Sequence, residues 1–151
     1  MAITRSNPNT VFLGGQRTQV NDLAASEVIT PGMVVERNVN AGVFRWRKNT
    51  IVAAGANIPI AFATDHAMAN KGVDDTYAAG DLVEVSIGEP GSVFWALIAS
   101  GQIIVAGDRL QTVNDGTVAK YSSGLAIGTA LEAKTNNGPT ALMRIRMEVG
   151  M

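Results

Sequence analysis

The sequence predicts an all-β protein, a compact β-barrel or sandwich of short strands that carries an extended N-terminal arm. Three observations lead to this prediction. Val, Ile and Thr are frequent, and sixteen Gly and five Pro interrupt the chain, as expected for short strands joined by turns. Hardly any stretch shows the periodicity of a helix. Asn114-Asp115-Gly116 lies between two alternating runs and is a strong hairpin signal, because these residues tolerate the positive φ of a tight turn.

Length and composition limit the possible partners. A chain of 151 residues fits one domain. Charged residues make up 17%, which is below the usual ~25%, so we expect much of the surface to be neutral or covered by another molecule. The net charge of −1 gives no reason to expect nucleic acid or an anionic membrane as a partner.

Cysteine is absent, which excludes disulfides and thiolate metal ligands. The first residues lack an apolar core of signal-peptide length, and no run approaches 18 apolar residues. We therefore expect the protein to be made in the cytoplasm and to leave it only as part of an assembled particle.

Residues 1–22 are predicted to form the arm, because Asn7-Pro8-Asn9 and Gly14-Gly15 interrupt any regular element. The apolar triplet Val11-Phe12-Leu13 has two interpretations. It either anchors a frayed terminus on its own domain, or it belongs to an arm that binds a neighbouring subunit or a larger surface and becomes ordered there. Under the second interpretation the contact residues are Arg5, Val11, Phe12, Leu13 and Arg17.

Residues 23–151 are predicted to form a single β domain in which one unit is used twice, at about 30–88 and 105–149. Each copy has a hairpin, a strand of small residues and a closing strand of alternating character. The corresponding segments are 32–36 and 107–111, 40–42 and 114–116, 43–47 and 117–121, 58–63 and 126–130, and 82–87 and 142–149. Pro59 lacks an amide donor, so the strand around it should be irregular or lie at an edge.

The run 92–99, SVFWALIA, is the most apolar of the chain and is predicted to be a strand with two buried faces. Such a strand needs cover on both sides. We expect one cover from its own domain and the other from a subunit partner, with Phe94, Trp95 and Leu97 at the oligomer interface.

The last strand alternates strictly. Met143, Ile145, Met147 and Val149 are predicted to point inward, and the residues between them outward.

The sequence predicts no enzyme, no cofactor and no metal site. His66 is the only histidine, no nucleophile-elbow motif is present, and no further ligands accompany His66 and Asp65. Gly14-Gly15 is not followed by the Lys-Ser/Thr of a phosphate-binding loop. Asp74-Asp75 lacks the regularly spaced oxygen ligands of a calcium site.

A family resemblance adds to this interpretation. The turns Pro31-Gly32 and Ala79-Gly80-Asp81, the Asp115-Gly116 hairpin, the run 127–132 (IGTALE) and the terminal alternating strand resemble those of tailed-phage capsid decoration (cement) proteins. The resemblance covers about residues 23–149 and is clearest over 78–133. It implies a β-clip-like sandwich that is generally trimeric.

The resemblance also implies a function. The protein would be a structural virion component on the outside of the phage head, with the major capsid protein and its own copies as partners. It would clamp the shell against internal pressure, without binding nucleic acid or membrane. The three arms of one trimer would bind together, so that weak single contacts would give tight attachment.

Two other classes remain open. The first is a carbohydrate- or receptor-binding β module of a phage fibre or surface protein, which would need exposed aromatic side chains. Trp46, Tyr77 and Tyr121 are the candidates for that role. The second is an accessory domain of an enzyme, since β-clip turns also occur in sugar-processing and pilus-assembly domains.

Overall fold

The computed structural model describes residues 10–56, 58–138 and 143–150. Nearly all regular structure within these ranges is β, which confirms the all-β prediction. A short 3-10 helix, η1, occupies Ala67–Ala69. The strands are β1 (Phe12–Gly14), β2 (Arg17–Val20), β3 (Val34–Asn40), β4 (Val43–Lys48), β5 (Ala61–Ala63), β6 (Val85–Gly88), β7 (Val93–Leu97), β8 (Ile103–Ile104), β9 (Arg109–Thr112), β10 (Val118–Lys120), β11 (Ala126–Ala130), β12 (Lys134–Thr135) and β13 (Arg144–Val149). Among the described residues, no helix has the length and apolar character needed to cross a bilayer.

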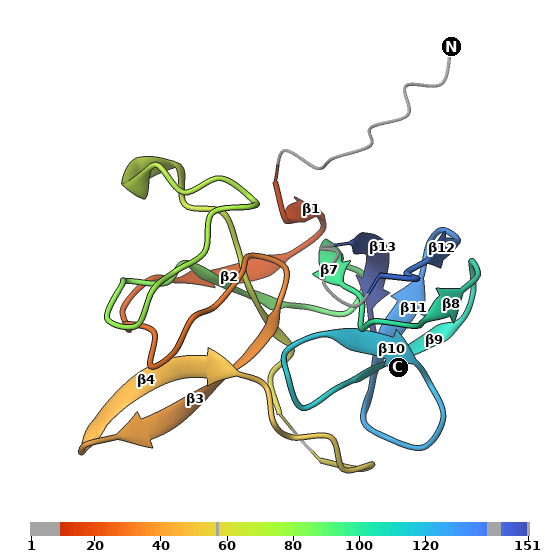
Figure 1. The fold of residues 1–151 in the computed structure, drawn as a ribbon, viewed down its shortest axis with the longest axis horizontal. Helices are drawn as coiled ribbons and strands as arrows, with labels where there is room; N and C mark the ends of the chain where they lie inside the picture. Colours follow the sequence, from red (N-terminus) through yellow and green to blue (C-terminus); the bar gives the residue numbers. More distant parts are fainter. Residues whose placement is uncertain (1–9, 57, 139–142, 151) are drawn as a thin grey trace.

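The strands form two large antiparallel sheets and one small one. The first sheet has the order β1-β7-β13-β11-β9-β10, the second β2-β6-β5-β3-β4, and β12 pairs with β8. Figure 1 shows the second sheet on the left and the first on the right. The sequence left a barrel and a sandwich as the two possible shapes. Neither large sheet closes on itself over the described residues, so the fold is a sandwich.

The two halves of the chain build their sheets in the same order. Across the second sheet, the strands β2 to β6 follow one another as the first, fifth, fourth, second and third in chain order. Across the first sheet, β7, β9, β10, β11 and β13 follow one another in the same way. Each half therefore contributes five strands of one topology, with β1 added at the edge of the first sheet.

The registers also agree between the halves when Gly32 is aligned with Gly107. Ala61 lies opposite Ile87, and Gly128 lies opposite Val149. Equivalent backbone N–H groups donate to equivalent carbonyl oxygens in the two halves. Gly32 donates to Ala63 (2.8 Å) as Gly107 does to Ala130 (2.9 Å), and Gly88 donates to Ile60 (2.8 Å) as Gly150 does to Ile127 (3.0 Å). Thr64 donates to Glu84 as Leu131 does to Arg146, at 2.9 Å each.

The first hairpin is longer than the second. Arg37 pairs with Trp46 in β3–β4, and Thr112 pairs with Val118 in β9–β10 at the equivalent place. The register therefore aligns Arg45, and not Val43, with Thr117. Six residues, 39–44, stand in the first hairpin where the second has three, 114–116. The sequence comparison missed this difference because both turns contain Asn and Gly.

The N-terminal segment joins the two sheets. β1 pairs with β7 in the first sheet and β2 with β6 in the second. Residues 10–22, assigned to the arm from the sequence, thus contribute an edge strand to each sheet, as Figure 1 shows. At the crossing Gly15 has a φ of 93°, and a Cβ there would lie 2.6 Å from Ser92 Cα. Glycine is required at this point.

The larger core lies between the sheets. Val34 and Phe62 come from the second sheet, and Leu110, Ile145 and Met147 from the first. The rings of Phe62 and Phe94 stack there with centroids 4.5 Å apart. A second core, which includes Val35, Trp46 and Tyr77, covers the other face of the second sheet.

The alternation of β13 is confirmed with one exception. Ile145, Met147 and Val149 are buried, but so is Arg144 on the face predicted to point outward. Its guanidinium donates to the carbonyl oxygen of Pro31 (3.0 Å) and to that of Val73. Nη1 also lies 2.8 Å from Asp74 Oδ1.

Candidate functional site: an apolar hollow and an exposed hairpin tip

Val11, proposed from the sequence as a contact residue, lies in the core of its own domain. Its side chain is fully buried. Its N–H donates to Asp65 Oδ1 (2.9 Å), and its carbonyl oxygen accepts from the N–H of Trp95 (2.8 Å). The fully buried side chain favours the interpretation in which the triplet anchors the segment on its own domain, and the contact of Val11 with another molecule stays a prediction.

The other arm residues lie nearer the surface. Phe12 packs against Phe94 with ring centroids 5.3 Å apart, and the Arg17 guanidinium lies 4.1 Å from the Phe12 ring centroid. Leu13 is exposed. Contact of Phe12, Leu13 and Arg17 with a capsid or a neighbouring subunit stays a prediction. Arg5 lies outside the described residues.

The β7 residues proposed for an oligomer interface are also buried within one chain. Phe94, Trp95 and Leu97 are at most 8% exposed. Phe94 faces the core between the sheets, and Trp95 and Leu97 point to the other face, where a Cβ on Gly32 would lie 3.4 Å from Leu97 Cγ. The strand with two buried faces is confirmed, and the oligomer contact expected for these three residues stays a prediction.

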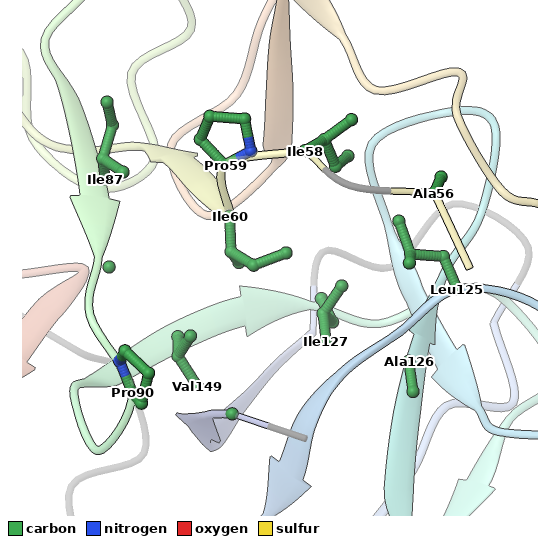
Figure 2. A pocket seen from close by; sticks show the side chains of 12 residues that line it. Ala56, Ile58, Pro59, Ile60, Ile87, Pro90, Leu125, Ala126, Ile127 and Val149 are labelled. Atoms are coloured by element: carbon green, nitrogen blue, oxygen red, sulfur yellow. The ribbon is translucent and has the colours of Figure 1, made fainter. Parts of the chain in front are cut away.

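An apolar hollow of about 260 Å³ lies between the two sheets. Figure 2 shows Ile60 and Ile127 pointing into it, with Val149 beside them, while the side chain of Ile87 at its edge points away. Ile60 and Ile127 occupy equivalent positions in the two halves, as do Ile87 and Val149. The hollow therefore lies where the two repeated units meet.

Glycine ends the strand on each side of this hollow. Gly88 follows Ile87, and Gly150 follows Val149. A Cβ on Gly88 would lie 2.8 Å from Phe94 Cε2 and 3.1 Å from Val149 Cγ2. Because these contacts leave no room for a side chain, the sheets approach closely here, and the isoleucines above them line an open space.

The tip of the β3–β4 hairpin is the second exposed apolar feature. Val39 is 60%, Val43 54% and Phe44 58% exposed. Val39 and Phe44 are cross-strand partners, so their side chains lie on one face and form a single apolar knob. The hairpin projects from the lower left of Figure 1.

Charged residues stand behind the tip. Arg37 lies over the Trp46 ring, 5.1 Å from its centroid. On the other face Glu36 Oε1 lies 2.7 Å from Arg47 Nε and also accepts from the Thr50 hydroxyl (2.7 Å). Burial acts to raise the pKa of Glu36, but the hydrogen bonds from Thr50 and Arg47 outweigh it and hold the pKa below its ordinary value.

The remaining polar contacts tie loops to the sheets. His66 Nε2 lies 3.2 Å from Glu84 Oε2. The Tyr77 hydroxyl donates to the carbonyl oxygen of Thr64 (2.6 Å), and burial raises the Tyr77 pKa. No group of three or more His, Asp or Glu is placed to hold a metal ion in the ranges that the structure covers.

The sequence analysis identified neither the hollow nor the hairpin tip. The tip could have been predicted from the sequence. Apolar residues that flank a hairpin turn are exposed at its end, and Val39, Val43 and Phe44 flank the turn at Ala41-Gly42. The hollow could not have been predicted, because Ile60 and Ile127 are 67 residues apart and meet only when the sheets pack.

No protein-family model matches the chain, and no curated protein matches it by sequence. Among solved structures, the chain is similar to the head fibre gp8.5 N base of bacteriophage phi29, with a TM-score of 0.55 and 15% sequence identity. The match covers 89% of this chain and 95% of that chain. At this level of identity the likeness shows a shared fold.

Proposed function

We propose that this chain is a structural protein of a phage head, located in the virion on the outside of the capsid. The observation that carries this proposal is the fold that it shares, over nearly its whole length, with the base of a phage head fibre. The resemblance of its turns to those of decoration proteins is independent of that comparison and suggests the same class.

Within this class we propose a decoration (cement) role, with the major capsid protein and its own copies in a homotrimer as partners. A protein that clamps a shell needs a rigid body and surfaces that other molecules cover. The two sheets supply the rigid body, since edge strands from residues 10–20 tie both together. The hairpin tip and the hollow supply apolar surface, which in a monomer of this size indicates an interaction site.

The base of a head fibre is the second candidate, favoured by the comparison itself. Both roles place the domain on the head, but a fibre base also carries a projecting fibre. Electron microscopy of particles separates the two roles. A compact knob at each site would support decoration, and a knob extended by a shaft would support the fibre base.

A carbohydrate-binding module receives less support. Of the three aromatic residues that the sequence offered for sugar contact, Trp46 is 2% and Tyr77 0% exposed. Tyr121 alone is partly exposed, and the Arg109 guanidinium stands 4.6 Å from its ring centroid. Stacking on a sugar requires an open aromatic face, which two of the three side chains lack.

The head-binding proposal is tested with particles. Mass spectrometry of purified virions should find this chain at a copy number comparable with that of the major shell protein. Heads assembled without it should bind the added protein and better resist heat or chelator. A chain that is absent from virions and does not bind such heads would refute the proposal, and binding on a glycan array would support the carbohydrate module.

A further inference from the structure

The hairpin tip is an addition that the fold does not need. The second hairpin performs the same structural role with three fewer residues, and its turn packs against the domain. The carbonyl oxygen of Gly116 accepts from the N–H of Val34 (2.8 Å), and a Cβ on Gly116 would lie 3.2 Å from Met33. The longer first hairpin instead extends into solvent and ends in Val39, Val43 and Phe44.

The hollow can receive an apolar side chain. Its walls include Ile60, Ile127 and Val149, and Pro59 and Pro90 stand exposed at its edge. Ile60 is only partly buried, so an apolar group that enters removes more of its surface from water. A knob and a hollow of matching chemistry thus occur at two different places on one chain.

The charges beside the two features are complementary. Arg37 is exposed and lies on the same face of the hairpin as Val39 and Phe44, and Glu89 lies at the edge of the hollow between Gly88 and Pro90. Neither Arg37 nor Glu89 has an ion-pair partner within the described part of the chain. Opposite charges around an apolar contact favour the correct partner and orientation.

We propose that the β3–β4 tip of one copy inserts Phe44 and Val39 into the hollow of a second copy, with Arg37 against Glu89. The contact is heterologous because the tip and the hollow are different surfaces. Repetition of it through a rotation closes a ring of copies. This inference supplies the contact for the self-association included in the proposed function, and it is independent of what the assembled protein binds.

The test measures self-association of the purified full-length chain, without phage heads, by native mass spectrometry and analytical ultracentrifugation across a concentration series. The chain should form a closed oligomer. Phe44→Ser removes the knob and should raise the dissociation constant about tenfold or more. Met68→Ser is the matched control, since Met68 is 96% exposed on η1, and should associate as the original chain does.

A charge reversal tests the proposed pairing. Arg37→Glu and Glu89→Arg should each weaken association, and the double variant should regain most of the loss. Both residues are exposed, so thermal unfolding should show that each variant keeps the fold, with at most a small loss where Arg37 leaves the Trp46 ring.

Three results would overturn the inference: a monomer throughout the series, unchanged association of the Phe44→Ser variant, or no recovery in the double variant. Head binding is measured separately. An oligomer that forms as described but does not bind heads would refute the proposed function alone, and head binding by a monomer would refute this contact alone.

Discussion

Ile60 and Ile127 occupy equivalent positions in the two repeated units and line the same hollow from opposite sheets. Each carbonyl oxygen accepts a hydrogen bond from the glycine that ends the neighbouring strand, Gly88 for Ile60 and Gly150 for Ile127. Two units with one register therefore meet around an apolar space.

Gly128→Ala should destabilise the protein, although its equivalent in the other unit is Ala61. A Cβ at Gly128 would lie 2.2 Å from Glu148 O and 2.6 Å from Met147 Cε, so β13 would have to move. We expect the free energy of unfolding, measured with urea, to fall by about 1–3 kcal/mol. Gly14→Ala is the control, because no atom lies within 4 Å of a Cβ there, and equal losses for both variants would contradict the argument.

Val11→Ala should lower the free energy of unfolding by about 2 kcal/mol, since it leaves a cavity in the main core. Leu13→Ala, two residues along the same segment, should cost less than about 1 kcal/mol because Leu13 is 42% exposed. Thermal or urea unfolding of both variants tests this. A larger loss for Leu13→Ala would mean that the segment is not held on its own domain through Val11.

Glu36→Gln should make stability less sensitive to acid. The folded-state pKa of Glu36 lies below the ordinary value of 4.5, so its charged form stabilises the fold fully above that value. The contribution is lost as the pH falls through the folded-state pKa. Urea unfolding should show a loss of about 1–2 kcal/mol for the variant at pH 7 and a shrinking difference in acid. Asp22→Asn, at an exposed position, is the control, and a difference that grew in acid would contradict the sign.

Ala41→Asn should stabilise the first hairpin. Ala41 has a φ of 52° and Gly42 of 78°, so both central residues of the turn are left-handed, where Asn is tolerated better than Ala. We expect a gain of about 0.5 kcal/mol in the free energy of unfolding, and a loss of about 1 kcal/mol for Ala41→Val, whose branched side chain is strained there. The reverse order in thermal unfolding would refute this turn geometry.

The buried residues of β13 illustrate how far the sequence could be interpreted. Alternation predicted Ile145 and Met147 in the core, because side chains on a strand alternate between faces. It could not predict the burial of Arg144, whose partners Pro31 and Asp74 are 113 and 70 residues away along the chain. A charged residue becomes buried only when distant groups satisfy its donors, and periodicity carries no information about those groups.

The N-terminal segment shows the same limit for the candidate site. The apolar triplet Val11-Phe12-Leu13 indicated that something covers it, and one of the two interpretations was its own domain. The choice depended on the pairing of β1 with β7, and the amide of Val11 is held there by Asp65, 54 residues away. The same reasoning applies to β7, where Phe94 packs in the core between the sheets and Leu97 points to the other face, near the loop at Gly32.

The sequence by itself determined the all-β class, the turns and the inward faces of the strands, since these depend on local backbone preferences and on the two-residue period of a strand. Only the tertiary structure decided which molecule covers each apolar surface. The packing of two sheets buried Val11 and β7 within one chain, and it left the hairpin tip and the hollow between Ile60 and Ile127 in contact with solvent. Burial is a property of distant segments brought together, so Phe44 and Phe94, both on strands, have opposite environments in the fold.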